Sequence, residues 1–159
     1  MRLFAYDRKA AVDYAERWAL GRNPDYYNFD ALGGDCTNFA SQCLYAGCRV
    51  MNDSENGWYY HGLNRRSPSW TGVSFFYDFL INHHGAGPFA LQVSSDKIEP
   101  GDFIQLGNGV TFYHTLVVLD AGLRRINVAA HSQDALARPL SSYSFETARF
   151  LHIVSARDV

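Results

Sequence analysis

The chain has 159 residues, of which 47% are hydrophobic and 19% are charged, a composition typical of a globular protein. A chain of this length can bury a stable core, so we expect a single domain over residues 1–159. The formal net charge is −2 without any run of like charges, which argues against nucleic acid and anionic membranes as partners.

The amino-terminal segment, MRLFAYDRKAAV, has neither the apolar core of a signal peptide nor the length of a membrane-spanning segment. The sequence therefore predicts a protein that works in the cytoplasm, or one that is exported by a route that this sequence does not encode.

The first expected helix follows Asp7, a residue type that favours the N-cap position. Apolar residues then recur at helical spacing, at Ala11, Tyr14, Ala15 and Trp18. Gly21 lies where a glycine commonly follows a helix end. These signals predict an amphipathic helix between Asp7 and Gly21.

A loop rich in turn formers and aromatic residues follows, RNPDYYNFDALGG, and leads into a second helix from about Cys36 to Ala46, which we expect to stop at Gly47. A third helix is expected over 71–81, where four apolar residues share a face: Val73, Phe76, Tyr77 and Leu80. Gly85, Gly87 and Pro88 end it.

The second half of the chain has the signals of β-strands. KIEPGDFIQL contains a Pro-Gly turn before a short strand, FYHTLVVLD is a β-branched apolar run, and RRINVAAHS follows a tight turn. A last strand is expected over 150–154. We therefore predict an α+β fold in which amino-terminal helices pack on an antiparallel sheet.

The three cysteines, Cys36, Cys43 and Cys48, are too close together for a disulfide framework, and their spacing does not match a structural zinc site. We expect no metal and no cofactor. Cys36 differs from the other two because it falls in the first turn of the second helix, where unpaired N–H groups favour a thiolate. Cys36 is therefore either a buried structural thiol or a nucleophile.

His114 is the histidine that the strand pattern does not explain, because it interrupts an apolar run and needs a polar partner or a cleft. The alternative is a hydrogen-bonded core histidine. Four others lie in ordinary places, in a polar loop, near a helix end or in the last strand: His61, His83, His84 and His152.

His131 can be placed by strand pairing. A hairpin that turns about Gly122 and Leu123 puts His131 directly opposite His114 on one face of the sheet, whereas Asn127 lies farther along that face. We therefore expect His131 to orient His114. A slip of one residue in the pairing would turn His131 to the other face of the sheet. The alternative interpretation is that His131 lies at the strand end and faces solvent.

The segment Asn56–Trp70 has aromatic and basic residues without helical or strand periodicity. Trp58, Tyr59, Arg65 and Trp70 are expected to line a substrate groove, with rings that stack on sugar or peptide and a guanidinium that pairs with a carboxylate. The alternative is that the aromatic side chains are buried as packing.

Six segments together resemble the bacterial putative amidase domain family of the papain-like superfamily, which also contains CHAP and NlpC-type cell-wall hydrolases. They are DCTNFASQCL, RSPSWTG, PGDFIQL, HTLVV, AAHS and RPLSSYS. The resemblance covers nearly the whole chain and implies a papain-like fold.

This resemblance implies that Cys36 is the nucleophile, His114 the base and His131 the third polar residue of a cysteine amidase, with peptidoglycan stem peptides as substrate. An oxyanion hole would use the backbone N–H of Cys36 and a second donor from Tyr27 or Asn28. Two alternatives remain open: a binding module for glycan or peptide without turnover, and an acyltransferase with the same thioester chemistry.

Overall fold

The structure is a computed structural model that describes residues 1–158. The helices are α1 (Arg8–Trp18), α2 (Cys36–Cys48), α3 (Pro68–Thr71), α4 (Val73–Asn82) and the short 3-10 turns η1 (Ser95–Lys97) and η2 (Leu140–Ser142). The strands are β1 (Arg2–Phe4), β2 (Gly87–Val93), β3 (Phe103–Gly107), β4 (Phe112–Ala121), β5 (Ile126–Ala130), β6 (Ala135–Pro139) and β7 (Thr147–Asp158).

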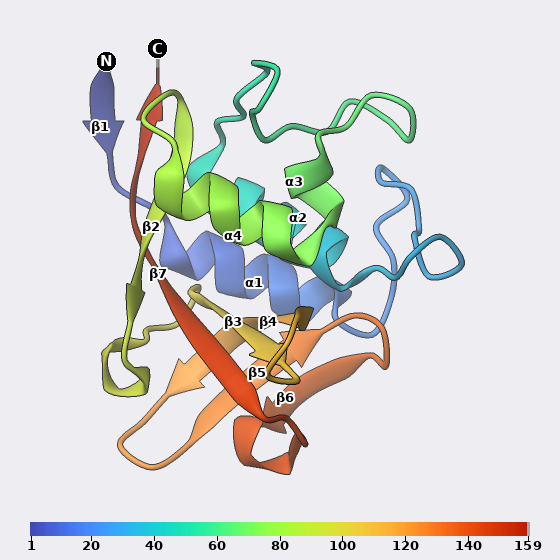
Figure 1. The fold of residues 1–159 in the computed structure, drawn as a ribbon, viewed down its shortest axis with the longest axis vertical. Helices are drawn as coiled ribbons and strands as arrows, with labels where there is room; N and C mark the ends of the chain where they lie inside the picture. The colour runs from blue at the N-terminus through green and yellow to red at the C-terminus, as the bar shows by residue number, and fades with distance from the viewer. Residues whose placement is uncertain (159) are drawn as a thin grey trace.

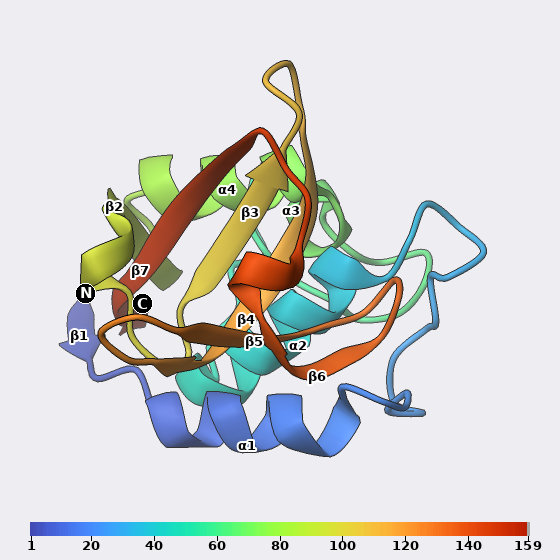
Figure 2. The ribbon, with the colours of Figure 1, turned by 90° about the horizontal axis from the view of Figure 1, so that it is seen from below.

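The strands form one sheet in the order β1-β7-β3-β4-β5-β6, and β2 also pairs with β7. Each of these pairs is antiparallel. The helices α1, α2 and α4 lie together on one side of the strands (Figure 1), and all three contact β4. In the view from below, α1 and α4 are seen at opposite edges of β3 and β4 (Figure 2). The predicted α+β class with an antiparallel sheet is confirmed.

Strand β4 separates two apolar cores because its side chains alternate between the faces of the sheet. Val117 and Leu119 join the core beneath the helices, whereas Leu116 and Val118 join a second core on the other face. By the same alternation, Thr115 faces the core beneath the helices and His114 faces the second core.

Helix α1 begins as predicted, since the Asp7 side chain accepts a hydrogen bond from the Ala10 N–H at 3.0 Å. The second helix was expected to stop at Gly47, and that prediction is wrong. Helix α2 continues to Cys48, and left-handed Arg49 ends it. Gly47 is needed for packing, because a Cβ there would lie 2.4 Å from the Tyr6 ring and 2.8 Å from the Asp7 carbonyl oxygen.

The helix expected over 71–81 is confirmed as α4, although the extended backbone at Gly72 separates it from the one-turn helix α3. Strands β3, β4, β5 and β7 lie where the sequence predicts strands. Strands β1, β2 and β6 were not predicted. β1 has three residues, β2 begins with Gly-Pro and β6 ends in proline, so each lacks the usual strand pattern.

The expected register of β4 and β5 is wrong. The ladder pairs Val117 with Ala129, and a bulge around Leu119 shifts the pairing nearer the turn. Continued from Val117, this register would place His131 opposite Thr115 and not opposite His114. His131 and His114 therefore belong to different faces of the sheet.

The aromatic rings of Trp58 and Trp70 are fully buried, so the expectation that they line a substrate groove is wrong for both. Their ring centroids are 4.6 Å apart, and helix α2 satisfies both indole N–H groups. Trp58 donates to Ser41 Oγ and Trp70 donates to Asn38 Oδ1, each at 3.0 Å. The packing alternative describes these two side chains.

Trp58→Ala is therefore expected to lower the free energy of unfolding by about 3–5 kcal/mol, because it opens a cavity and leaves the Ser41 hydroxyl without its donor. Chemical denaturation measures the change. Phe75→Ala is the matched control, since that ring is 60% exposed and its loss should change stability little. Equal effects of the two substitutions would contradict this assignment.

Candidate active site

Cys36 is the first residue of α2, and its side chain is 8% exposed at the end of the helix that carries unpaired N–H groups. Burial raises the pKa of the thiol, and the nearby Asp35 carboxylate acts in the same direction. Hydrogen bonds from the Thr115 backbone and the Thr37 hydroxyl oppose this rise, because they favour the thiolate.

Strand β5 pairs with β4 only as far as Val117, so the part of β4 before Val117 is paired with β3 alone. The Cys36 sulfur is linked to this part of β4 through Thr37, whose Oγ1 lies 3.7 Å from the sulfur and 2.9 Å from Thr115 Oγ1. His114 directly precedes Thr115 on β4.

The His114 imidazole belongs to the face of β4 that carries Leu116 and Val118. Its ring centroid lies 6.1 Å from that of Tyr143, beyond β6. Within residues 1–158 the imidazole forms no hydrogen bond, whether to Cys36 or to another side chain. A rotation of the side chain about its Cα is needed to bring it to the sulfur.

Burial, with a smaller contribution from the Arg138 cation, lowers the pKa of His114 to about 4. The imidazole is thus neutral at neutral pH. The raised pKa of Cys36 and the lowered pKa of His114 both favour a resting pair of neutral thiol and neutral imidazole. Such a pair suits general-base activation of the thiol when substrate binds.

We expect an NMR titration of the folded protein to show the His114 imidazole protonating near pH 4. Since the unfolded chain takes up this proton near pH 6.5, the neutral form contributes its full stability above about pH 6.5. That contribution is lost as the pH falls through the folded pKa. A midpoint for His114 at the ordinary value would contradict the buried site described here.

His131 does not orient His114, and that prediction is wrong. Its side chain is 1% exposed, its Nδ1 lies 2.5 Å from Asp35 Oδ2, and its Nε2 lies 2.8 Å from the Trp18 carbonyl oxygen. Both contacts are hydrogen bonds when both ring nitrogens carry protons. The ring also stacks on Phe39 with 3.9 Å between centroids. Both ring nitrogens of His131 are thus occupied by contacts to groups other than His114.

Asp35 has structural contacts that sequence reasoning missed. Its side chain does not cap α2, and instead accepts from the Phe29 N–H at 2.8 Å and the Asn38 side chain at 2.9 Å. Burial raises the pKa of Asp35, but these bonds and the one from His131 outweigh it, so the pKa is lowered. A carboxylate directly before a candidate nucleophile was the available signal.

Asp35→Asn is expected to lower the free energy of unfolding by about 3–5 kcal/mol, because it breaks the buried ion pair with His131. Thermal and urea denaturation measure this change. Asp53→Asn is the control, since Asp53 pairs with His61 at an exposed site and its loss should cost less than about 1 kcal/mol. Unchanged stability in Asp35→Asn would show that the pair does not hold the start of α2.

The chain was compared with models of known protein families. The “Putative amidase domain” family matches residues 5–154. The chain belongs to this family. The family's description indicates amide hydrolysis and therefore a hydrolase. The matched range includes Cys36, His114 and the pair of Asp35 with His131.

A relative of this amidase-domain chain is “Uncharacterized protein YhbB” of Bacillus subtilis (strain 168). The two are 40% identical over 125 residues, which cover 74% of this chain and 38% of the relative. The chain thus spans less than two fifths of that relative's length. No solved structure matches the chain.

Two loop residues of the amidase domain were expected to supply an oxyanion donor. The Tyr27 backbone N–H is already bonded to the Tyr60 hydroxyl at 2.7 Å, so it is not free. Within residues 1–158 the Tyr27 phenol and the Asn28 side-chain nitrogen have no hydrogen-bond partner, and both residues are exposed. These two side-chain donors remain the alternatives.

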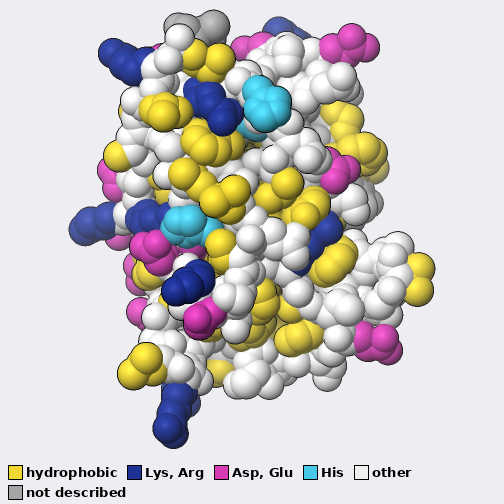
Figure 3. Space-filling model, turned by 60° about the vertical axis from the view of Figure 1, so that its left-hand side comes forward, with side chains coloured by type: hydrophobic (Ala, Val, Ile, Leu, Met, Phe, Trp, Pro, Cys, Tyr) yellow, Lys and Arg dark blue, Asp and Glu magenta, His cyan; other side chains and the backbone are white. Residues whose placement is uncertain are grey.

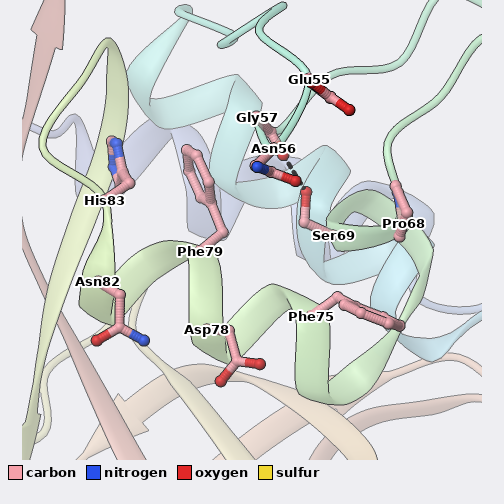
Figure 4. A pocket seen from close by; sticks show the side chains of 10 residues that line it. All are labelled: Glu55, Asn56, Gly57, Pro68, Ser69, Phe75, Asp78, Phe79, Asn82 and His83. Atoms are coloured by element: carbon pink, nitrogen blue, oxygen red, sulfur yellow. Dashed lines mark hydrogen bonds between the residues drawn. The ribbon is translucent and has the colours of Figure 1, made fainter.

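Tyr59 and Arg65 line a hollow of about 520 Å³ with Asp53, His61, Asn64 and Arg66. A separate pocket of about 620 Å³ lies between the loop at Gly57 and the outer face of α4, where Phe75 and Phe79 project (Figure 4). Neither Cys36 nor His114 lines either space. The groove expected from the aromatic segment is therefore reduced to the hollow at Tyr59 and Arg65.

Three further features concern the described residues and their surface. They contain no group of three or more His, Cys, Asp or Glu residues that could hold a metal ion. No helix among them is both long and apolar enough to cross a membrane. On the face shown in Figure 3, acidic and basic side chains are scattered and do not form a patch of one sign.

Proposed function

We propose that this member of the amidase-domain family is a cysteine hydrolase with a papain-like fold, in which Cys36 attacks the carbonyl carbon of an amide. The observation that carries the proposal is the position of the Cys36 sulfur, which lies at a helix N-terminus and is linked through Thr37 to Thr115, the residue after His114 on β4. Helix N–H groups favour the developing thiolate, and the His114 imidazole is neutral and able to accept a proton once it has rotated to the sulfur.

In the proposed reaction, His114 rotates toward the sulfur and takes the thiol proton as Cys36 attacks the substrate carbonyl. The tetrahedral intermediate collapses when the amine leaves with that proton, which gives a thioester on Cys36. Water, deprotonated by His114, then releases the carboxylic acid and restores the thiol. The Cys36 backbone N–H and a donor from Tyr27 or Asn28 would stabilise the oxyanion.

The pair of Asp35 and His131 has a different role in this proposal. Its hydrogen bonds hold the loop before α2 and the end of β5 together, so it fixes the position of the nucleophile without transferring its proton. The third polar residue is thus a positioning group for Cys36.

The proposed substrate is a stem peptide of bacterial peptidoglycan, recognised at the hollow beside Tyr59 and Arg65. Arg65 is exposed and forms no ion pair within residues 1–158, so its guanidinium can receive a peptide carboxylate. Arg65→Gln should raise KM by roughly tenfold, with kcat nearly unchanged, because it removes one charged binding contact. Arg124→Gln at the exposed β4–β5 turn is the control. An unchanged KM in Arg65→Gln would show that the substrate does not bind at the hollow beside Tyr59 and Arg65.

Incubation with purified peptidoglycan, followed by mass spectrometry of the soluble products, tests the proposed activity. Hydrolysis yields a new amine and a new carboxylic acid with the gain of one water. Addition of a soluble primary amine distinguishes the acyltransferase alternative, which would form an amide with that amine. Binding to peptidoglycan without any product would support the non-catalytic module instead.

A further inference from the structure

Three polar side chains are fully buried directly behind Cys36, although nothing in the proposed reaction uses them. They are Thr37 on α2, Gln105 on β3 and Thr115 on β4. Burying a polar group costs free energy unless it is hydrogen-bonded, so their contacts should account for their presence.

These side chains form a continuous series of contacts that ends at the sulfur. Gln105 Nε2 donates to Thr115 Oγ1 at 3.2 Å, and Thr115 Oγ1 lies 2.9 Å from Thr37 Oγ1. Thr37 Oγ1 in turn lies 3.7 Å from Cys36 Sγ, within hydrogen-bond range for sulfur. The series joins β3, β4 and the first turn of α2.

The far end of the series is fixed in one orientation. Gln105 Nε2 also donates to the Val73 carbonyl oxygen at 2.8 Å, and Gln105 Oε1 accepts from Arg149 Nε at 2.9 Å. The Arg149 guanidinium lies between the rings of Tyr77 and Phe112, 3.6 and 3.8 Å from their centroids. A flipped amide would lose both bonds, so Gln105 must present its N–H to Thr115.

This fixed donor determines what the two hydroxyls can do. While Cys36 is a thiol, its S–H can donate to Thr37, and Thr37 can donate to Thr115. When the thiol loses its proton, both hydroxyls can rotate, so that Gln105 donates to Thr115, Thr115 to Thr37 and Thr37 to the sulfur. The second arrangement satisfies every contact of the series and needs no proton transfer along it.

We propose that Thr37 is a positioning residue that donates its hydroxyl hydrogen to the Cys36 thiolate, and that Thr115 and Gln105 hold it in the donating orientation. The role assigned to Thr37 rests on the proposed function only in taking Cys36 as the nucleophile. The contacts themselves do not depend on any substrate.

The test is the pH dependence of Cys36 alkylation by iodoacetamide, followed by mass spectrometry of the Cys36 peptide in the full chain. Thr37→Val keeps the shape and removes the hydroxyl, so the midpoint should rise by about one pH unit or more and alkylation near pH 7.5 should slow about tenfold. The plateau rate at high pH should not change. Thr37→Ser restores a hydroxyl and should restore the wild-type profile.

Ser41→Ala is the matched control, because Ser41 is a buried hydroxyl on the same helix that bonds Trp58 and the Trp70 carbonyl. It should lower the melting temperature without moving the alkylation midpoint. Gln105→Leu leaves Thr115 without its fixed donor and should move the midpoint in the same direction as Thr37→Val, even if Thr37→Val folds poorly.

A wild-type midpoint in Thr37→Val, or a Thr37→Ser profile as displaced as that of Thr37→Val, would overturn the proposal. An unmoved midpoint in Gln105→Leu would overturn the part assigned to Gln105. Because alkylation needs no amide substrate, these results are independent of whether the wild-type protein hydrolyses peptidoglycan.

Discussion

Cys36→Ala is expected to lower amide hydrolysis by at least about three orders of magnitude, because it removes the atom that forms the acyl intermediate. The fold should be retained, since the side chain lies at the start of α2 and not in its packed centre. Product release from peptidoglycan and circular dichroism of the same preparation measure the two effects.

Cys48→Ala is the control for this substitution, because Cys48 is a buried thiol at the other end of the same helix. It should keep its activity. Iodoacetamide should also label Cys36 before Cys43 and Cys48, which are 0% and 1% exposed. Full activity in Cys36→Ala would show that the Cys36 thiol is not the nucleophile.

His114→Ala is the second substitution with a large expected effect. It should lower kcat/KM by about 10²–10⁴-fold, the usual contribution of a positioned base, while the melting temperature changes little. The neutral imidazole has no hydrogen bond to lose within residues 1–158. His114→Gln should be equally inactive, because an amide cannot take the proton.

His131→Ala separates the two histidines. His131 has two hydrogen bonds and a ring stacked on it, so its loss should appear first as reduced stability. If His131→Ala is as stable as the wild type but inactive, whereas His114→Ala is active, the roles assigned here are reversed.

The sequence was sufficient to predict the elements that carry the candidate site. The cap at Asp7, the helix that begins at Cys36 and the strand that contains His114 are all local patterns, and each is present in the structure. Local patterns fix where an element begins and which residues share its faces. They were enough to single out Cys36 and His114.

The errors concern contacts between segments that are distant in the chain. The β4–β5 hairpin turns at Leu123 and Arg124, one residue later than expected, and the bulge near Leu119 then shifts the pairing by one residue. Such a bulge has no signal in a single sequence. Gly47 remains inside α2 because Tyr6 packs against it, not because of any helix signal. The polar neighbours of Trp58 in the sequence led us to expect a groove residue. In the structure its ring is in the core, where the indole N–H donates to the Ser41 hydroxyl.

The role of Asp35 could not be predicted for the same reason. Its partner Phe29 lies in the loop before α2, and its partner His131 follows β5, 96 residues after Asp35 in the sequence. Only the folded arrangement shows that this carboxylate joins them, and the proposed role of His131 in positioning the helix follows from that contact.

The most direct test of the central claim is detection of the acyl-enzyme. Wild-type protein is mixed with a peptidoglycan fragment, stopped in acid within the first turnovers and digested for mass spectrometry. The account predicts an acyl group from the substrate on the peptide that contains Cys36, removable by hydroxylamine and absent in Cys36→Ala. Turnover without any such adduct, or with an adduct on another residue, would contradict the assignment of Cys36 as the nucleophile.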